Sequence, residues 1–351
     1  MIIDSDFSPP PWLKNPHAQT LLANLIHPPT PQVSREILEL DDGDELELAH
    51  GTAQGSDRVL ILHGLEGSLR SPYAARIVNA LNAAGIPVSF LFYRGCNGRP
   101  NRLARSYHSG ETDDLRQVIA HLKRQGAKRL ALIGYSLGGN VTLKYLGEAP
   151  PDTAIHCAAA ISTPLLLDIC ARRMQQGFSR IYQKELLARL KRKLAAKRQL
   201  LRQQGFDIEL AALRSFVDFD DAYTAPVHGF DKAERYYRIC SARQYLHAID
   251  RPTLILQARD DPFMTPAVLP AVDELSPAIR FELADRGGHV GFIGGRGPLR
   301  LRPYFWLEPK LVDWLREQNF GQRTDSCRKP EITAYSSNPL QDETNTTRRM
   351  T

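Results

Sequence analysis

An α/β fold built on a mostly parallel sheet is the architecture that this sequence predicts, and three observations predict it. Short apolar segments typical of buried strands alternate along the chain with segments of helical spacing. A serine flanked by glycines stands between a strand-like run and a helix-like run, in the stretch LALIGYSLGGNVTLKYL at residues 130–146. The alternation stops over residues 162–250 and then resumes, which indicates an insertion between strands of one sheet.

Composition places the chain among soluble globular proteins. It has 351 residues, of which 42% are hydrophobic and 24% charged, enough for a sizeable core and one α/β domain that carries an insertion. The N-terminus has early acidic residues and prolines instead of the apolar core of a signal peptide, and no segment reaches the roughly 20 apolar residues that a membrane span requires. The cysteines are odd in number, scattered and without a CxxC pair. We therefore expect a cytoplasmic protein with reduced thiols.

The first half of the chain predicts a sheet with a hairpin at one edge. Residues 1–34 are rich in proline and lack a clear period, which favours an arm laid over the domain. Residues 35–51 alternate in polarity around the turn Asp41-Asp42-Gly43-Asp44, as in a hairpin. Strands and helices then follow in turn: strand 58–62, helix 72–84, strand 87–93, helix 111–125, the strand and helix around the serine, and strand 154–161. Such alternation implies right-handed crossovers between parallel strands.

The second half contains the insertion and the end of the core. Residues 162–250 show helical spacing throughout, and an insertion here would lie above the C-terminal strand edges, where ligands bind in such sheets, so we interpret it as a cap or lid. The alternation of strands and helices resumes with strand 252–257, a helix near 265–275, strand 279–283 and a helix near 308–317. The predicted division is therefore an arm at 1–34, a core at 35–161 and 251–318, a cap at 162–250, and a flexible polar tail at 319–351.

The glycine-flanked serine has the pattern of a nucleophile elbow. In Gly134-Tyr135-Ser136-Leu137-Gly138, a Cβ atom at either glycine would collide with the neighbouring strand or helix, and the turn lifts the Ser136 hydroxyl clear of the sheet. The five-residue pattern alone is weak, because serine between glycines is also ordinary loop chemistry. The flanking strand and helix strengthen it, and they make Ser136 the candidate nucleophile.

A serine nucleophile needs a base, which in turn needs an orienting acid. His289 lies in a glycine-rich loop directly after the last predicted core strand, and the order serine, acid, histidine is the one known for this elbow class. The alternative is a packed loop histidine. Asp260 and Asp261 follow the preceding strand; we choose Asp261 as the acid, since Pro262 stiffens the turn after it, and expect Asp260 to bind backbone N–H groups. Both could instead only cap the turn.

The tetrahedral oxyanion needs two donors. The Leu137 N–H opens the helix after the serine, and the Leu65 N–H in the loop after strand 58–62 is the second candidate, with Gly64 allowing close approach of the backbone. His63 is interpreted as a structural residue. The sequence has no His-x-x-x-His, EF-hand or phosphate-loop pattern, so we expect catalysis without a cofactor or a metal. Residues 94–98 and 107–111 either line the pocket or only form turns and a helix cap.

A basic segment runs from residue 186 to residue 204 without any acidic residue, and apolar residues stand at helical spacing opposite its charges. The cations are Arg189, Lys191, Arg192, Lys193, Lys197, Arg198 and Arg202. A cap helix with a solvated basic face is the plainest interpretation. Peripheral attraction to anionic lipid surfaces or acyl substrates is the second. Nucleic-acid binding is the least favoured, because no binding module or interleaved aromatic residue accompanies the charge.

Seven short motifs together resemble the YheT-like branch of the α/β-hydrolases, over about residues 10–318. They are Asn15-Pro16-His17-Ala18-Gln19-Thr20, His63-Gly64-Leu65-Glu66-Gly67-Ser68, Arg94-Gly95-Cys96, Tyr107-His108-Ser109-Gly110-Glu111-Thr112, Gly134-Tyr135-Ser136-Leu137-Gly138-Gly139-Asn140, Asp260-Asp261-Pro262-Phe263-Met264 and Gly287-Gly288-His289-Val290-Gly291-Phe292. The resemblance implies an α/β-hydrolase fold with a helical cap and a triad of Ser136, Asp261 and His289. Members of the family include carboxylesterases and lipases of phospholipids and acylglycerols.

The sequence thus leads to one main hypothesis and one alternative. The main hypothesis is a serine hydrolase that cleaves carboxylic esters, with short to medium acyl chains or lipid-like groups, through an acyl-enzyme intermediate. The alternative is a non-catalytic protein of the same fold that uses its basic cap at membranes or acidic partners. Acyl length, the choice among ester, thioester and amide, the oligomeric state and the role of the tail are left open by the sequence.

Overall fold

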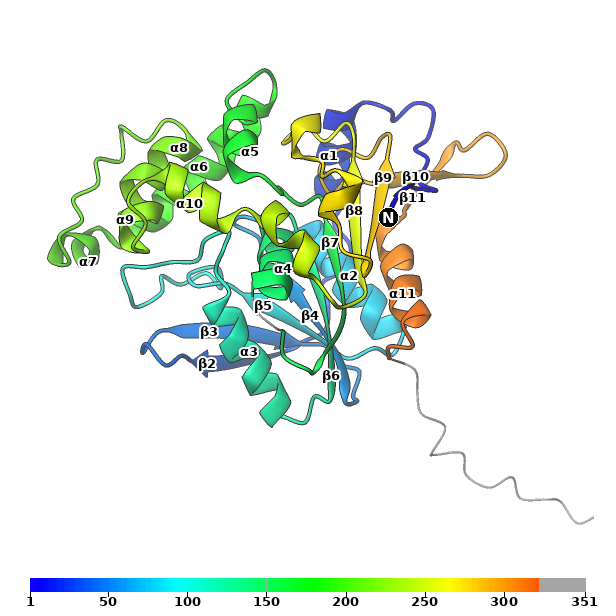
Figure 1. Ribbon diagram of the computed structural model, residues 1–351, viewed down its shortest axis with the longest axis horizontal. Helices are drawn as coiled ribbons and strands as arrows, with labels where there is room; N and C mark the ends of the chain where they lie inside the picture. Colours follow the sequence, from blue (N-terminus) through cyan, green and yellow to red (C-terminus); the bar gives the residue numbers. More distant parts are fainter. Residues whose placement is uncertain (149–150, 322–351) are drawn as a thin grey trace, which may run out of the picture. The chain divides into compact units, whose positions relative to one another are not determined.

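The computed structural model describes residues 1–148 and 151–321, which form one compact unit (Figure 1). The expected tail at 319–351 therefore lies outside the described residues, apart from its first three. Within the described ranges, no helix has the length and apolar character needed to cross a membrane.

A nine-stranded sheet organises the molecule, with the strand order β1-β9-β8-β7-β6-β4-β5-β3-β2. Its strands are β1 (Ile2–Asp4), β2 (Ser34–Glu39), β3 (Glu45–His50), β4 (Asp57–Leu62), β5 (Val88–Phe92), β6 (Arg129–Tyr135), β7 (Ile155–Ile161), β8 (Thr253–Ala258) and β9 (Ile279–Ala284). Neighbours pair in parallel except for β3, which runs antiparallel to both β5 and β2. The predicted mostly parallel sheet with a hairpin at one edge is confirmed.

Helices cover both faces of the sheet (Figure 1). On β4, Leu60 and Leu62 point into the same apolar cluster as α3 (Asp113–Arg124) and α4 (Leu137–Glu148), while Val59 and Ile61 point into the cluster that contains α2 (Pro72–Ala83) and α11 (Leu307–Glu317). Successive strand residues face opposite sides. Because both sides are buried, β4 reads in the sequence as an unbroken apolar run.

Between β7 and β8 the chain leaves the sheet and forms a set of helices, which we call the cap. They are α5 (Leu167–Arg173), α6 (Ser179–Ala196), α7 (Arg198–Gln203), α8 (Phe216–Phe219), a π-helical turn η1 (Asp220–Thr224), α9 (Ala225–Val227), α10 (Ala233–Cys240) and a 3₁₀ segment η2 (Ala242–Ala248). No strand occurs among residues 162–250, all of which the structure describes. Two apolar clusters of their own hold these helices together.

The structure differs from the sequence prediction at three places. The N-terminal arm supplies an edge strand, β1, which pairs with β9, and a helix, α1 (Pro16–Leu25). The predicted helix near 265–275 is wrong: only two 3₁₀ turns occur there, η3 (Pro266–Val268) and η4 (Val272–Glu274). Pro270 lacks an N–H and disfavours helical backbone at the residue before it. A hairpin of β10 (Ile293–Arg296) and β11 (Arg302–Phe305) also escaped prediction.

Candidate active site

Ser136 stands at a sharp turn between β6 and α4, with a left-handed φ of 51°. A Cβ on Gly134 would lie 2.3 Å from the Gly138 carbonyl oxygen, and one on Gly138 would lie 2.2 Å from the Leu62 carbonyl oxygen. The steric reason for both glycines is therefore confirmed. The Ser136 N–H donates to the Ile161 carbonyl at 2.8 Å, which ties the strained residue to β7.

His289 lies in the loop after β9 and is held from several sides. Its N–H donates to Thr20 Oγ1 in α1 at 2.9 Å, and the next N–H, of Val290, donates to Ser162 Oγ at 3.0 Å. The ring of Phe263 stacks on the imidazole with 3.9 Å between ring centroids. Neither Thr20 nor Ser162 has a role that follows from the residues around it in the sequence. Thr20 belongs to the first of the seven motifs, and this membership is the only feature of the sequence that could have indicated its role.

The structure brings Ser136, His289 and Asp261 together. His289 Nε2 lies 3.0 Å from Ser136 Oγ, and His289 Nδ1 lies 2.8 Å from Asp261 Oδ2. Asp261 is almost fully buried, and its other oxygen accepts the Phe263 N–H at 2.8 Å. Asp260 instead accepts the Gly288 N–H at 3.0 Å, so this neighbouring carboxylate binds the backbone of the histidine loop. One imidazole thus bridges a hydroxyl and a carboxylate.

His63, close to the same site, has a different environment. Its Nδ1 donates to the Gly64 carbonyl at 2.6 Å, and its Nε2 accepts the Tyr93 N–H at 3.3 Å. Burial lowers the pKa of His63 to about 3, so the ring stays neutral. Since both ring nitrogens are used by the backbone, His63 has the contacts of a structural residue.

The two expected oxyanion donors both line the cavity that contains Ser136 and His289. Leu137 is the first residue of α4, so its N–H has no acceptor within the helix. Around Leu65, the Gly64 N–H donates to the Tyr73 hydroxyl and the Glu66 N–H to the Tyr107 hydroxyl. Among the hydrogen bonds of residues 1–148 and 151–321, none uses the Leu65 N–H. Two amides in this cavity are thus left available for a ligand.

The cavity has a volume of about 140 Å³ and is walled mainly by the cap. We call it the ester pocket, because the sequence predicts ester cleavage at Ser136. Its apolar wall includes Leu167, Cys170, Leu186, Leu190, Phe216 and Phe219. Asp220 adds one carboxyl group to this wall, and the Tyr237 hydroxyl donates to it at 2.6 Å. Burial raises the pKa of Asp220 to about 6. The pocket therefore suits an apolar group and gains a negative charge only above about that pH.

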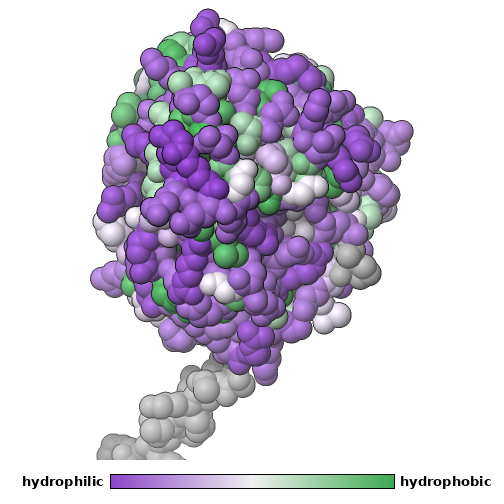
Figure 2. Space-filling model, turned by 90° about the vertical axis from the view of Figure 1, so that its left-hand side faces the viewer, coloured by the Kyte–Doolittle hydropathy of each residue, from purple (hydrophilic) through white to green (hydrophobic). Residues whose placement is uncertain are grey.

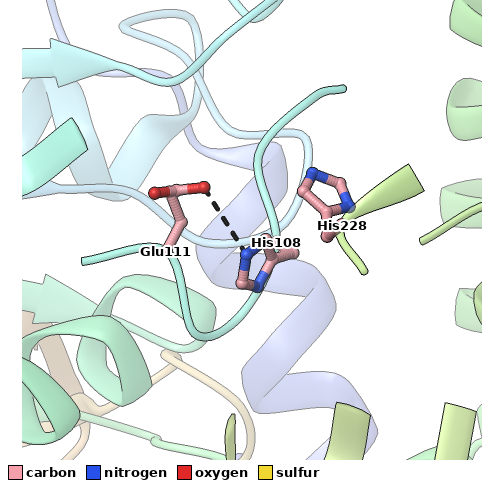
Figure 3. A group of neighbouring side chains, drawn as sticks. All are labelled: His108, Glu111 and His228. Carbon is pink, nitrogen blue, oxygen red and sulfur yellow. Dashed lines mark ion pairs between the residues drawn. The ribbon is translucent and has the colours of Figure 1, made fainter. Parts of the chain in front are cut away.

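Next to the pocket, His108 and Glu111 face each other as an ion pair and His228 lies beside His108 (Figure 3). The three side chains have ligand atoms within 4.8 Å of one another, close enough to share a metal ion. Several of these side-chain atoms already form hydrogen bonds within the protein. The two ring nitrogens of His228 lie 2.7 and 2.8 Å from the carbonyl oxygens of Thr224 and Ser106, and the Arg105 guanidinium donates to Glu111 at 2.6 Å. Burial lowers the pKa of His228, which favours the neutral ring, so only one of its two nitrogens donates a hydrogen. Metal binding through that nitrogen or through Glu111 would displace hydrogen bonds already formed.

The comparisons with known proteins agree with this geometry. The family model for the alpha/beta hydrolase fold matches residues 57–295. The protein "Putative esterase YheT" of Escherichia coli (strain K12) is 42% identical over 323 residues, which cover 89% of this chain and 93% of that protein. The chain belongs to the α/β hydrolase family. Within it, the chain is a YheT-like member, as the seven motifs had indicated.

More distant relatives of this α/β hydrolase carry lipid-related names. "Phospholipase ABHD3" of Mus musculus is 25% identical over 311 residues, which cover 85% of this chain and 75% of that protein. A solved structure of the Pyrococcus furiosus esterase Pf2001 superimposes with a TM-score of 0.53, covering 83% of this chain and 92% of that one at 18% identity. At that identity the structural match shows the shared fold. The relatives' names, esterase and phospholipase, support hydrolase activity in this branch.

Proposed function

We propose that this α/β hydrolase is a serine hydrolase that cleaves carboxylic esters through an acyl-enzyme intermediate. Ser136 Oγ attacks the carbonyl carbon while His289 Nε2 takes the hydroxyl proton, and the amides of Leu65 and Leu137 stabilise the oxyanion. His289 then gives the proton to the departing alcohol. In the second half, His289 takes a proton from water, whose oxygen attacks the acyl carbon; Ser136 regains its hydrogen and the acid leaves.

One observation carries the proposal: the His289 ring lies within hydrogen-bond distance of both the Ser136 hydroxyl and the Asp261 carboxylate. Asp261 keeps the Nδ1 proton in place, which leaves Nε2 free to act as a base, and it stabilises the imidazolium that forms. An aspartate at the elbow would have favoured dehalogenase or epoxide chemistry, whereas a serine favours acyl transfer.

The ester pocket supports an apolar acyl group as the part of the substrate that is bound there. Its wall is formed chiefly by aliphatic and aromatic side chains of α5, α6 and α8. Burying such a chain contributes roughly 0.8 kcal/mol for each methylene group removed from water. We therefore propose short to medium acyl chains or lipid-like esters, in agreement with the esterase and phospholipase names of the relatives.

A fluorophosphonate probe tests the proposal, because it labels only an activated serine. We expect the folded wild-type protein to be labelled and to hydrolyse p-nitrophenyl octanoate. Ser136→Ala should lose both properties while circular dichroism shows an unchanged fold. If the folded wild type takes up no label and cleaves no ester, the proposal is wrong and the non-catalytic binding protein with a basic cap takes its place.

A further inference from the structure

A second cavity of about 570 Å³, which we call the basic groove, lies next to the ester pocket. It runs between α6 and the loop after β5. The two cavities share Ser106, Tyr107, Leu190 and Phe219 as lining residues, so they meet at one wall. The groove also reaches Glu66, the neighbour of Leu65 in the loop that offers the oxyanion amide. A group held in the groove would therefore lie in the cavity that adjoins the one containing Ser136.

The lining of the groove is strongly cationic. Seven basic residues line it, against two acidic ones, Glu66 and Glu185; the basic residues are Arg70, Arg94, Arg99, Arg189, Arg192, Lys193 and Lys197. A concave surface with charges of one sign concentrates the electric field and attracts small ions of the opposite sign. The groove thus has the electrostatic character of a site for an anion.

Five of these cations already have partners. Arg94 pairs with Asp114 at 2.6 Å, Arg99 with Glu45 at 3.3 Å, Arg189 with Glu185 at 3.0 Å, and Lys193 with Glu66 at 2.7 Å. Lys197 donates to three oxygens, those of the Asn101 side chain and of the Ala104 and Arg105 backbone. These contacts already use some of the donors of the five side chains.

Arg70 and Arg192 differ from the other five. Both are exposed side chains that line the groove, and neither forms an ion pair with any residue in the described ranges 1–148 and 151–321. They come from different elements, Arg70 from the loop after β4 and Arg192 from α6 of the cap. A guanidinium presents planar, forked donors that match the oxygens of a phosphate or a carboxylate.

We propose that the basic groove binds a phosphate group on the alcohol part of the ester, with Arg70 and Arg192 as its main contacts. The acyl chain lies in the ester pocket, and the ester bond lies at the wall that the two cavities share. This inference rests on the proposed function, since it names the substrate class of the same site. It divides the substrate into an apolar half and an anionic half.

On the face of the molecule that Figure 2 shows, the surface favours a single small anion over a membrane. On the face shown in Figure 2, hydrophilic residues predominate and hydrophobic ones form small, separate patches. Proteins that insert into a membrane present a broad apolar face beside their basic residues. The cations of the groove instead line a concavity.

Competition kinetics test the proposal with two compounds that differ only in the phosphate: 1-octanoylglycerol 3-phosphate and 1-octanoylglycerol. Each is added below its critical micelle concentration as a competitor of p-nitrophenyl octanoate hydrolysis, so that binding is measured whether or not the competitor is cleaved. We expect the phosphate-bearing compound to inhibit with an inhibition constant at least about tenfold lower, as for hydrogen bonds to charged groups. The advantage should shrink as salt screens the charges.

The double variant Arg70→Gln with Arg192→Gln should reduce this advantage to less than about threefold. The matched control is Lys184→Gln with Arg198→Gln, which removes the same charge from exposed cap positions outside the groove lining and should keep the full advantage. Equal inhibition constants for the two compounds in the wild type would overturn the proposal. So would an equal loss of the advantage in both double variants, because general charge attraction would then explain it.

Inorganic phosphate distinguishes a substrate group from a free anion. At the concentration at which 1-octanoylglycerol 3-phosphate inhibits by half, inorganic phosphate alone should not inhibit; equal inhibition by both would also contradict the proposal. The proposed function has a separate readout. If the wild type hydrolyses p-nitrophenyl octanoate but shows no preference for the phosphate-bearing competitor, only this inference fails.

Discussion

The ester pocket and the basic groove share a wall, yet they differ in almost every physical respect. The pocket is apolar and contains the serine, the histidine and the two available amides, whereas the groove is lined by seven cations and contains no group of the triad. The same helix, α6, serves both: Leu186 and Leu190 face the pocket, while Arg189, Arg192 and Lys193 line the groove. One amphipathic helix thus separates the ester pocket, which contains the serine and the histidine, from the cationic groove.

This comparison refines the interpretation of the basic segment. The apolar side of α6 lies on the pocket, as expected for a cap helix. Its basic side is not simply solvated, because Lys193 bonds to Glu66 in the loop after β4, and Lys197, directly after the helix, is buried. Burial lowers the pKa of Lys197 to about 8. Some cations of this cap, such as Lys193 and Lys197, therefore stabilise the fold, whereas others, such as Arg192, are free to bind a ligand.

Replacing His289 by alanine should give the largest effect. It should abolish catalysis in the ester pocket and leave anion binding in the basic groove intact. Without its base, the serine loses activation, and we expect kcat/KM for p-nitrophenyl octanoate to fall on the order of 10⁴-fold or more. The preference for 1-octanoylglycerol 3-phosphate over 1-octanoylglycerol, measured by calorimetry as the ratio of their dissociation constants, should change less than about threefold, since His289 lines the ester pocket and not the groove. Loss of both properties would show that the two cavities do not act separately.

The adjacent carboxylates provide the next test, with a control of the same chemistry. Asp261→Asn should lower kcat on the order of 10³- to 10⁴-fold, because an amide cannot hold the tautomer of His289 that leaves Nε2 free. Asp260→Asn should lower kcat less than about tenfold, since its side-chain oxygen can still accept the Gly288 N–H. Steady-state kinetics on p-nitrophenyl octanoate decide between them. Equal losses in the two variants would contradict the assignment of Asp261.

Much of the fold could be predicted because it follows from local patterns. A parallel strand buried on both faces, such as β4, leaves a continuous apolar run, and the elbow glycines leave a motif with a steric cause. The choice between Asp260 and Asp261 rested on a single proline. Only the structure shows which of the two faces the imidazole, because adjacent residues point in different directions and the loop path decides.

Other features depend on contacts that no local pattern records. The edge strand β1 has three residues, too few for a period, and it gains its place by pairing with β9 at the far end of the chain. Thr20 supports His289 across a separation of 269 residues. The basic groove likewise joins residues 70 and 192, which are distant in the sequence. The cations were visible in the sequence, but the cavity that unites them was not.

Asp220, in the wall of the ester pocket, should make the free energy of unfolding depend on pH. Its pKa is raised by burial to about 6, above its unfolded value, so the native state keeps the proton longer. Stability from this group is therefore complete below about pH 4 and is lost as the pH rises through about 6, by up to about 3 kcal/mol. Urea unfolding between pH 4 and 7 should show this loss in the wild type but not in Asp220→Asn. Parallel pH curves for the two proteins would contradict it.

The smallest predicted effect concerns the wall that separates the two cavities. Lys193 donates to Glu66 at 2.7 Å, and the Tyr107 hydroxyl both accepts the Glu66 N–H and donates to the same carboxylate. This network fixes the loop that carries the Leu65 N–H. Lys193→Met should therefore lower kcat for a short neutral p-nitrophenyl ester roughly tenfold with little change in KM, a part of the ~10²–10³ that complete loss of an oxyanion donor costs.

The control for this change is Lys191→Met, on the same helix, whose amine donates to the Leu213 carbonyl within the cap. Among the residues that the structure describes, this amine forms no hydrogen bond or ion pair with the loop that carries Leu65. This variant should leave kcat and KM within about twofold of the wild type, as for a surface substitution. Since the ester carries no charge, a rise in KM alone in Lys193→Met would mean that the lysine acts by shaping the pocket. A fall in kcat alone means that the cap positions the amide that stabilises the oxyanion, so that the basic side of α6 contributes to the chemistry on its apolar side.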